Sequence, residues 1–365
     1  MDLKQTCALL LSRQGLRPSG NSLWIRQLYQ AIQWIKKQHF ILYTSLGQKT
    51  WEMIVFLAQQ ETIEQVIVIP SKNLDDFEYQ KRFSIEQFCL DLSYVHFQPV
   101  FSDDQKSLLY CRDQTIVSEA DIILPISVRK KGHMADLISW KQQDNPETII
   151  NHFQVDYEKS RNSFAYHVNS ENLSPEIYQC SSIYLIHWTR TSNHQWPTEL
   201  LFNYYDAILN SNNYPRNALA TLENILKRQI IKASSRHMPK KTPTVSFSEL
   251  PPKQAINLMR WRSRYRQMSF EPYGIGIDKK YAQSIGIQEV HYYKQQRDKP
   301  DHILPWLCQS EGKYSDWRLE KEFRFFGDLD ISHIPRNKLI CFCLKNNEAK
   351  KIYAQYRVKA MAITK

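Results

Sequence analysis

The chain has 365 residues, which is enough for two domains that each bury a core of their own. Hydrophobic residues make up 42% and charged residues 23%, a composition typical of globular proteins, and no apolar run approaches the roughly 18 residues that span a bilayer. These values exclude a membrane-spanning protein. The net charge of +11 favours a polyanionic partner.

The seven cysteines are scattered, and only Cys341 and Cys343 lie close together. An odd number of scattered cysteines indicates a reducing compartment, and without a second close pair no metal site is expected. The first apolar run, Cys7–Leu11, has no basic cluster before it and therefore does not predict a signal peptide. We expect a cytoplasmic protein with no membrane partner.

Buried strands alternate with amphipathic helices in the first half of the chain. Residues Leu23–Lys37 and Thr50–Gln60 have the apolar periodicity of helices. Four short apolar runs predict strands: Phe40–Thr44, Val66–Ile69, Val95–Phe101 and Ile122–Ile126. Strands separated by helices imply a parallel sheet with helices on both faces. The sequence therefore predicts an α/β Rossmann-like domain over residues 1–145.

Polar residues follow two of these strands, at the edge of the sheet where ligands bind in such folds. Ser45-Leu46-Gly47 leads into a helix and could hold an anion with backbone N–H groups, and Arg129-Lys130-Lys131 follows the last strand. Because neither G-x-G-x-x-G nor a Walker lysine pattern is present, a purely structural domain fits equally well. We expect a domain that senses a ligand or docks a partner.

The apolar periodicity is lost from Lys141 to Glu176, where Asn, Gln, Ser and charged residues are frequent. We therefore place a linker at residues 146–180 and a second domain at residues 181–365. Short segments separated by turns predict an α+β domain there, with a mostly antiparallel or split sheet. The segments are helices at Thr198–Asn210 and Ala218–Gln229, and strands at Ile183–Ile186, Thr244–Glu249, Tyr273–Ile277, Glu289–Tyr293, Trp317–Gly327 and Leu339–Leu344.

Two polar clusters in this second half have the residue types of a reactive site. His187 and Thr189 follow an apolar strand and lie on one side of an extended chain. Glu320, Glu322 and Arg324 share one strand face, where the arginine can hold one carboxylate ionised. The alternatives are a capped strand end and a self-neutralising row of exposed charges.

The order of these motifs resembles that of the ADP-ribosyltransferase superfamily. An H-x-T strand end comes first, followed by a helix that runs into I-L-x-x-x-I-x-A-S, a V-S-F-S-E strand and an E-x-E-x-R strand. The last two elements also resemble a bacterial family of unknown function with a W-x-x-E-x-E-x-R signature. The resemblance covers about Ser181–Lys365 and implies an ADP-ribosyltransferase-like fold for the C-terminal domain.

The resemblance also implies NAD as the substrate. His187 would hydrogen-bond the adenosine-side ribose, Glu322 would be the catalytic glutamate, and Glu320 would orient or deprotonate an acceptor. The tyrosine that usually stacks on nicotinamide is absent from T-V-S-F-S-E, and Phe247 or Tyr273 would replace it. The full set of implied NAD contacts is His187, Thr189, Arg190, Ser246, Phe247, Ser248, Tyr273 and Arg324.

Four arginines alternate with aromatic residues downstream: Arg260, Arg262, Arg264 and Arg266 flank Trp261 and Tyr265. Such a pattern can hold phosphates while stacking bases. The alternative interpretation is a solvated helix face.

We therefore expect an NAD-dependent ADP-ribosyltransferase or another NAD-consuming enzyme whose acceptor is protein, nucleic acid or water. The resemblance to this family also implies a role as a bacterial toxin or in phage defence. The alternative is a non-enzymatic nucleic-acid-binding protein that uses residues 260–266, and a third hypothesis is a related transferase that acts on RNA ends. If His187 and Glu322 converge in one cleft, the enzyme hypothesis gains.

Overall fold

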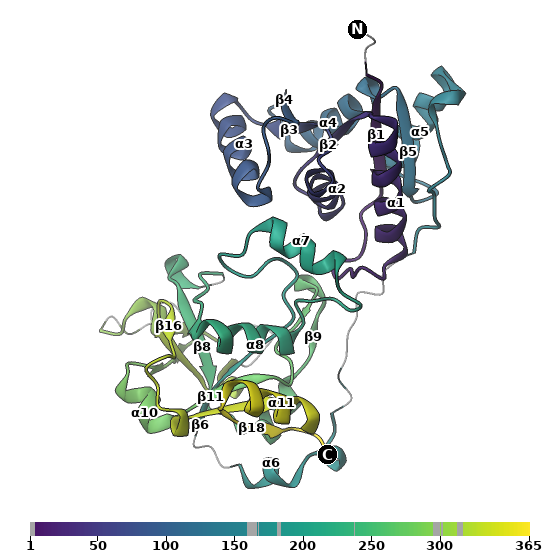
Figure 1. Cartoon of the computed structure of the whole chain (residues 1–365). Helices are drawn as coiled ribbons and strands as arrows, with labels where there is room; N and C mark the ends of the chain where they lie inside the picture. The colour runs from purple at the N-terminus through teal and green to yellow at the C-terminus, as the bar shows by residue number, and fades with distance from the viewer. Residues whose placement is uncertain are drawn as a thin grey trace. The chain divides into compact units, whose positions relative to one another are not determined.

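The structure is a computed structural model, and it describes residues 4–158, 166, 168–180, 184–236, 238–294, 300, 302–311 and 317–365. The chain divides into two units, of which the first comprises Met1–Asn162 and Thr198–Pro215 and the second comprises Ser163–Pro197 and Arg216–Lys365 (Figure 1). This division differs from the expected ranges 1–145, 146–180 and 181–365, because a segment from the second half of the sequence belongs to the first unit.

A five-stranded parallel sheet forms the centre of the first unit, in the order β4-β3-β2-β1-β5. Its strands are β1 (Thr6–Leu11), β2 (Ile41–Ser45), β3 (Gln65–Ser71), β4 (Val95–Phe101) and β5 (Ile122–Ser127). The expected Rossmann-like sheet is confirmed. We did not predict β1 as a strand, although its apolar run is completely buried between β2 and β5.

Helices flank this sheet because each carries an apolar stripe. In α1 the buried residues Ile25, Leu28, Ile32 and Ile35 recur every three or four positions. Asn73 caps the first turn of α3 by accepting a hydrogen bond from the Asp76 amide at 2.9 Å. The helices are α1 (Leu23–Gln38), α2 (Lys49–Gln60), α3 (Leu74–Phe88), α4 (Gln105–Glu119), α5 (His133–Asp144) and α7 (Leu201–Leu209).

Helix α7 belongs to the first unit because its apolar face completes that unit's core. Tyr204 and Tyr205 are each 1% exposed and Ile208 is fully buried in the same cluster as the sheet. The Tyr205 hydroxyl donates a hydrogen bond to the Glu52 carboxylate at 2.5 Å. Packing of these side chains therefore sets the unit boundary, and the composition of the chain did not reveal it.

The second unit is built on a seven-stranded mixed sheet in the order β12-β15-β8-β6-β11-β17-β18, in which only β17 and β18 pair in parallel. The expected α+β organisation is confirmed at this level. Its strands are β6 (Tyr184–Trp188), β8 (Thr244–Ser248), β11 (Gly274–Asp278), β12 (Gln288–Glu289), β15 (Glu322–Phe326), β17 (Leu339–Cys343) and β18 (Lys359–Ala362).

Short helices and two-stranded pairs complete the second unit. The helices are α6 (Pro175–Gln179), α8 (Ala218–Arg228), α9 (Pro252–Ala255), α10 (Lys279–Ser284) and α11 (Asn346–Tyr356). The pairs are β7 (Ile230–Ile231) with β16 (Leu329–Asp330), β9 (Trp261–Arg262) with β10 (Gln267–Met268), and β13 (His291–Tyr293) with β14 (Cys308–Ser310). Among the described residues, no helix is long and apolar enough to cross a membrane.

Three expected segments take other forms. The expected strand Trp317–Gly327 is a 3-10 turn over Trp317–Glu320 followed by β15, because Lys321 adopts the left-handed conformation at φ 43°. Residues 260–266 form the β9–β10 hairpin rather than a helix face. Strand β6 spans Tyr184–Trp188, two residues further than the expected Ile183–Ile186, and Ile183 lies outside the described part of the chain.

Candidate functional site

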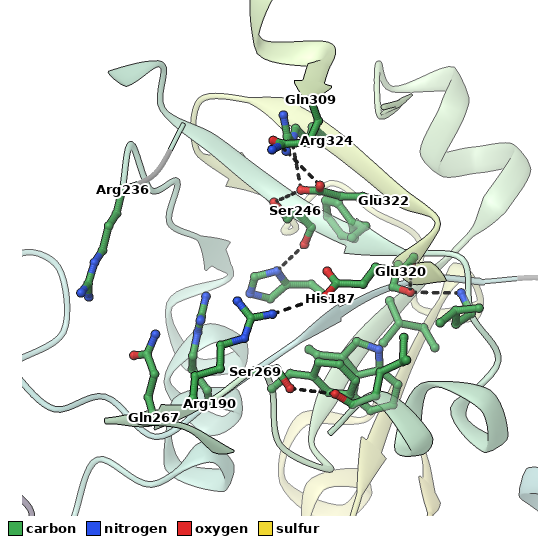
Figure 2. A pocket seen from close by; sticks show the side chains of 18 of the residues that line it. His187, Arg190, Arg236, Ser246, Gln267, Ser269, Gln309, Glu320, Glu322 and Arg324 are labelled. Carbon is green, nitrogen blue, oxygen red and sulfur yellow. Dashed lines mark hydrogen bonds and ion pairs between the residues drawn. The ribbon is translucent and has the colours of Figure 1, made fainter. Parts of the chain in front are cut away.

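A pocket of about 350 Å³ opens in the second unit over strands β6, β8 and β15 (Figure 2). A volume of this order is typical of small-molecule sites. Nine of the residues predicted from the sequence line it: His187, Arg190, Ser246, Phe247, Ser248, Arg262, Glu320, Glu322 and Arg324. Thr189, Tyr273, Arg260, Arg264 and Arg266 are not among its lining residues.

Strand pairing brings these side chains together from distant parts of the sequence. Strand β8 lies between β6 and β15, and its residues Ser246 and Ser248 pair with Arg324 and Glu322 of β15. On its other side, Ser248 pairs with Ile186 of β6, the residue before the histidine. The motifs that the sequence separates by about 130 residues therefore converge in one pocket.

A chain of hydrogen bonds connects the histidine to the catalytic carboxylate predicted from the sequence. The His187 Nδ1 lies 2.9 Å from the Ser246 carbonyl oxygen, and the Ser246 Oγ donates to Glu322 Oε1 at 2.7 Å (Figure 2). Because a carbonyl only accepts hydrogen bonds, Nδ1 carries the proton in this contact. The neutral ring then has an unshared electron pair at Nε2.

Burial also controls the charge of this histidine. It lowers the pKa of His187 to about 4, and the positive charge of Arg190 acts in the same direction, while the contact with Ser246 opposes the shift. The ring packs edge-on against Phe247, with centroids 5.8 Å apart. His187 is therefore neutral near pH 7 and can accept a hydrogen bond from a ligand hydroxyl.

Arg324 holds Glu322 with a bidentate ion pair. The guanidinium Nε lies 2.8 Å from Oε1 of Glu322, and Nη2 lies 2.9 Å from Oε2. Arg324 is 2% exposed, and its remaining donors bind the Trp306 carbonyl at 2.7 Å and the Gln309 amide oxygen at 2.9 Å. A guanidinium with all these partners fixes the carboxylate in place.

Glu320 has different partners from Glu322, because it lies in the 3-10 turn before β15 and not on the face of that strand. Its backbone carbonyl accepts a hydrogen bond from Ser248 Oγ at 2.6 Å, and its carboxylate makes a long contact of 3.4 Å with Arg262 Nη2. Burial raises the pKa of Glu320, the Glu322 carboxylate raises it further, and Arg262 opposes both effects. The pocket thus holds one carboxylate fixed by a guanidinium, Glu322, and one carboxyl group with a raised pKa, Glu320.

Two residues expected to bind NAD are not among the residues that line this pocket. Thr189 is 2% exposed, and its hydroxyl donates to the carbonyl oxygen of Ala218 at 2.9 Å rather than supporting His187. The Tyr273 hydroxyl donates to Glu348 at 3.1 Å, away from the pocket, so it does not replace the missing stacking tyrosine. Phe247 is the predicted aromatic residue that does line the pocket.

The arginines of the β9–β10 hairpin separate into two groups. Only Arg262 reaches the pocket. Arg264 lies over the Tyr265 ring with its guanidinium carbon 5.8 Å from the ring centroid, and Arg266 adopts the left-handed conformation at the turn of the hairpin. Arg262 therefore belongs to the pocket, whereas Arg260, Arg264 and Arg266 are exposed outside its lining.

Sequence reasoning did not predict several of the lining residues. Trp188, the middle residue of the H-x-T motif, stacks on Phe270 with ring centroids 5.5 Å apart, which forms an aromatic wall next to the histidine. Arg236 comes from the loop before β8 and stands in none of the motifs. The other missed polar residues are Gln267, Ser269 and Gln309.

The first unit has no free anion-binding turn at Ser45-Leu46-Gly47. The Gly47 backbone N–H donates to the carboxylate of Glu52, so the chain's own anion occupies this helix start. Ser45 is fully buried, and its hydroxyl donates to the Val68 carbonyl at 2.6 Å. These polar groups therefore stabilise the loop after β2.

No protein-family model matches the sequence, and no curated protein matches it either. Two solved structures resemble part of the chain, and both are of DNA processing protein A (DprA). The protein from Streptococcus pneumoniae is 10% identical, with 39% of this chain and 48% of that chain covered and a TM-score of 0.29. The protein from Helicobacter pylori, described for its single-stranded DNA binding mode, is 12% identical, with 40% and 65% covered and a TM-score of 0.29. At this TM-score the likeness carries no functional assignment.

Proposed function

We propose that the second unit cleaves the nicotinamide–ribose bond of NAD and transfers ADP-ribose to an acceptor or to water. The observation that carries this proposal is the hydrogen-bonded connection from His187 through Ser246 to Glu322. Three strands contribute one member each, so the arrangement requires the folded sheet.

The residue types suit cleavage of a glycosidic bond. Such cleavage passes through an oxocarbenium-like state in which positive charge develops on the ribose. An ionised carboxylate fixed beside that ring stabilises the charge more strongly in the transition state than in the ground state. Glu322, held by Arg324, takes this role, and the neutral His187 accepts a hydrogen bond from the adenosine-side ribose.

Glu320 suits the second half of the reaction. The bond between ribose C1′ and the pyridinium nitrogen breaks with its electron pair on nicotinamide, which leaves as a neutral molecule. The acceptor then attacks C1′ and must lose a proton. A carboxyl group whose pKa lies above its ordinary value can take that proton near neutral pH.

The test is release of nicotinamide from NAD by the intact protein, measured with and without added protein or nucleic-acid acceptors. Glu320→Gln should retain cleavage better than Glu322→Gln does, because the first acts on the acceptor and the second on the bond that breaks. The proposal is wrong if the wild-type protein neither releases nicotinamide nor transfers ADP-ribose under any of these conditions.

A second candidate function is nucleic-acid binding, and the distribution of charge favours it. The second unit contains 30 lysines and arginines against 16 aspartates and glutamates, a net charge of +14. The first unit contains 18 against 21, a net charge of −3. An excess confined to one unit is the electrostatic footprint expected of a polyanion-binding domain. The two functions are compatible, because a bound nucleic acid can be the acceptor.

A further inference from the structure

We propose that Arg190, Arg236 and Arg262 form a subsite for the diphosphate group of a dinucleotide. This inference rests on the proposed function and identifies which part of the substrate each side of the pocket binds. None of the three belongs to the hydrogen-bonded connection between His187 and Glu322.

The three guanidinium groups come from separate elements and reach the same pocket. Arg190 follows the end of β6, Arg236 lies in the loop before β8, and Arg262 ends β9. Figure 2 shows Arg236, Arg190 and Gln267 on one side of the pocket, and Glu322, Arg324 and Gln309 on another. The site therefore has a cationic side that is distinct from the reactive carboxylate.

Two of these positive charges lack an ion-pair partner in the part of the chain that the structure describes. No carboxylate there lies within ion-pair distance of the Arg190 or Arg236 guanidinium, whereas Arg262 contacts Glu320 at 3.4 Å. Burial lowers the pKa of Arg190, and the charges of Arg262 and Arg236 lower it further, while the carboxylates of Glu320 and Glu271 oppose the shift. Like charges brought together in this way repel one another until an anion binds between them.

The charge count matches a diphosphate. Four arginines and two glutamates line the pocket, which leaves a net charge of +2 when both carboxylates are ionised. The diphosphate diester of a dinucleotide carries two negative charges, and guanidinium groups bind phosphate oxygens with paired hydrogen bonds. The ribose held by His187 and the ribose beside Glu322 are the two sugars that such a diphosphate joins.

The experiment is calorimetric titration of the intact protein with ADP-ribose, which has the diphosphate but lacks nicotinamide, and with adenosine, which lacks both. We expect ADP-ribose to bind at least about tenfold more tightly than adenosine, since a charged hydrogen bond lost from a buried site typically costs that much. Arg236→Ala should remove about tenfold of the affinity for ADP-ribose and leave that for adenosine unchanged. Arg264→Ala is the matched control. Arg264 and Arg236 both lie over the Tyr265 ring, but Arg264 is not among the residues that line the pocket.

Equal affinity for ADP-ribose and adenosine would overturn the inference, and so would an equal loss of affinity in Arg236→Ala and Arg264→Ala. Tighter binding of a single-stranded oligonucleotide that competes with ADP-ribose would assign the three arginines to a polynucleotide backbone instead. Nicotinamide release separates this result from the proposed function. Tight ADP-ribose binding without nicotinamide release would support the diphosphate subsite and reject the proposed reaction. Nicotinamide release with an unchanged KM for NAD in Arg236→Ala would support the reaction and reject the subsite.

Discussion

Glu322 has a structural role besides the chemical role that we propose for it, and the two can be separated. Its partner Arg324 is buried, so removal of the carboxylate charge leaves a guanidinium without its counter-ion. Breaking a buried ion pair by removal of one partner is strongly destabilising, by about 3–5 kcal/mol.

We therefore expect Glu322→Gln to lower both the thermal midpoint and the rate of NAD cleavage. The rate should fall by about 10²–10³, the usual effect of removing a preorganised electrostatic group. Nicotinamide release is compared at a temperature at which circular dichroism shows both proteins folded. A folded Glu322→Gln protein that turns NAD over at the wild-type rate would show that the carboxylate is structural only.

His187 should make stability depend on pH. Its pKa of about 4 in the folded protein lies below the ordinary value of 6.5, so the unfolded chain binds a proton there first. The resulting stability is fully present above pH 6.5 and is lost as the pH falls towards 4, by about 2–3 kcal/mol in total. Urea unfolding of the wild type and of His187→Gln over this range measures the difference. Identical pH slopes in the two proteins would mean that the ring is solvated.

The sequence indicated several of the pocket-lining residues at this scale, because His187, Ser246, Glu320, Glu322 and Arg324 stand in short motifs on or beside strands. It could not show that Thr189 turns to the Ala218 carbonyl, since side-chain partners depend on which loop packs alongside. Arg236 and Gln309 were missed for the same reason: their place in the pocket follows from tertiary packing and leaves no local pattern.

At the scale of single elements, the break before β15 decides where Glu320 lies. Lys321 is exposed and adopts a left-handed conformation, at φ 43°, that few residues other than glycine adopt. The Lys321 carbonyl also accepts the Glu249 amide at 3.0 Å, which joins this turn to the end of β8. A continuous strand, as the alternating pattern suggested, would have required an extended residue at this position.

We expect Lys321→Gly to be tolerated and Lys321→Val to destabilise the protein by about 1–3 kcal/mol, because a β-branched residue is strained at positive φ. The valine variant should also impair transfer to the acceptor more than cleavage, since it displaces Glu320. Chemical denaturation and a comparison of transfer with nicotinamide release measure the two effects. Equal stability of the valine and glycine variants would argue against the break.

Element patterns in the sequence predicted the parallel sheet well, because buried strands and amphipathic helices have different periods. The sequence pattern did not predict strand β1, because a single apolar run with no expected element before it shows no alternation of strand and helix. Strand β18 escaped because Lys359–Ala362 is short and only partly buried, and its pairing with β17 comes from the tertiary fold.

At the scale of the whole molecule, the charge difference between the units makes a salt-dependent prediction. If the hairpin arginines hold a nucleic-acid backbone, affinity for a single-stranded oligonucleotide should fall by roughly 0.7 log units per contacted phosphate for each log unit of salt. Replacing Arg260 and Arg264 with alanine should flatten that slope, as measured by fluorescence anisotropy. An affinity that does not change with salt concentration would show that these arginines are solvated surface residues that do not contact the nucleic acid.

The division of the chain makes a further prediction about the first unit. A fragment of residues 1–162 lacks α7, whose side chains Leu201, Tyr204, Tyr205 and Ile208 are buried in that unit's core. We expect this fragment to melt at a lower temperature than the unit does in the intact chain and to bind a hydrophobic dye. A peptide of residues 198–215 added separately should raise the melting temperature, and a peptide with Tyr204 and Tyr205 replaced by alanine should not. A fragment as stable without the peptide as with it would mean that α7 is dispensable.

The chain passes between the two units after residues 162, 197 and 215, and this interleaving fixes the order in which they can be completed during synthesis. The ribosome produces β6 before α7, so the central strand of the second sheet emerges while the first unit still lacks its last helix. Its neighbours β8 and β11 are synthesised only later. An apolar strand without partners is prone to pair with other chains. The nascent protein must therefore keep β6 from aggregating while it finishes a unit that began more than 170 residues earlier.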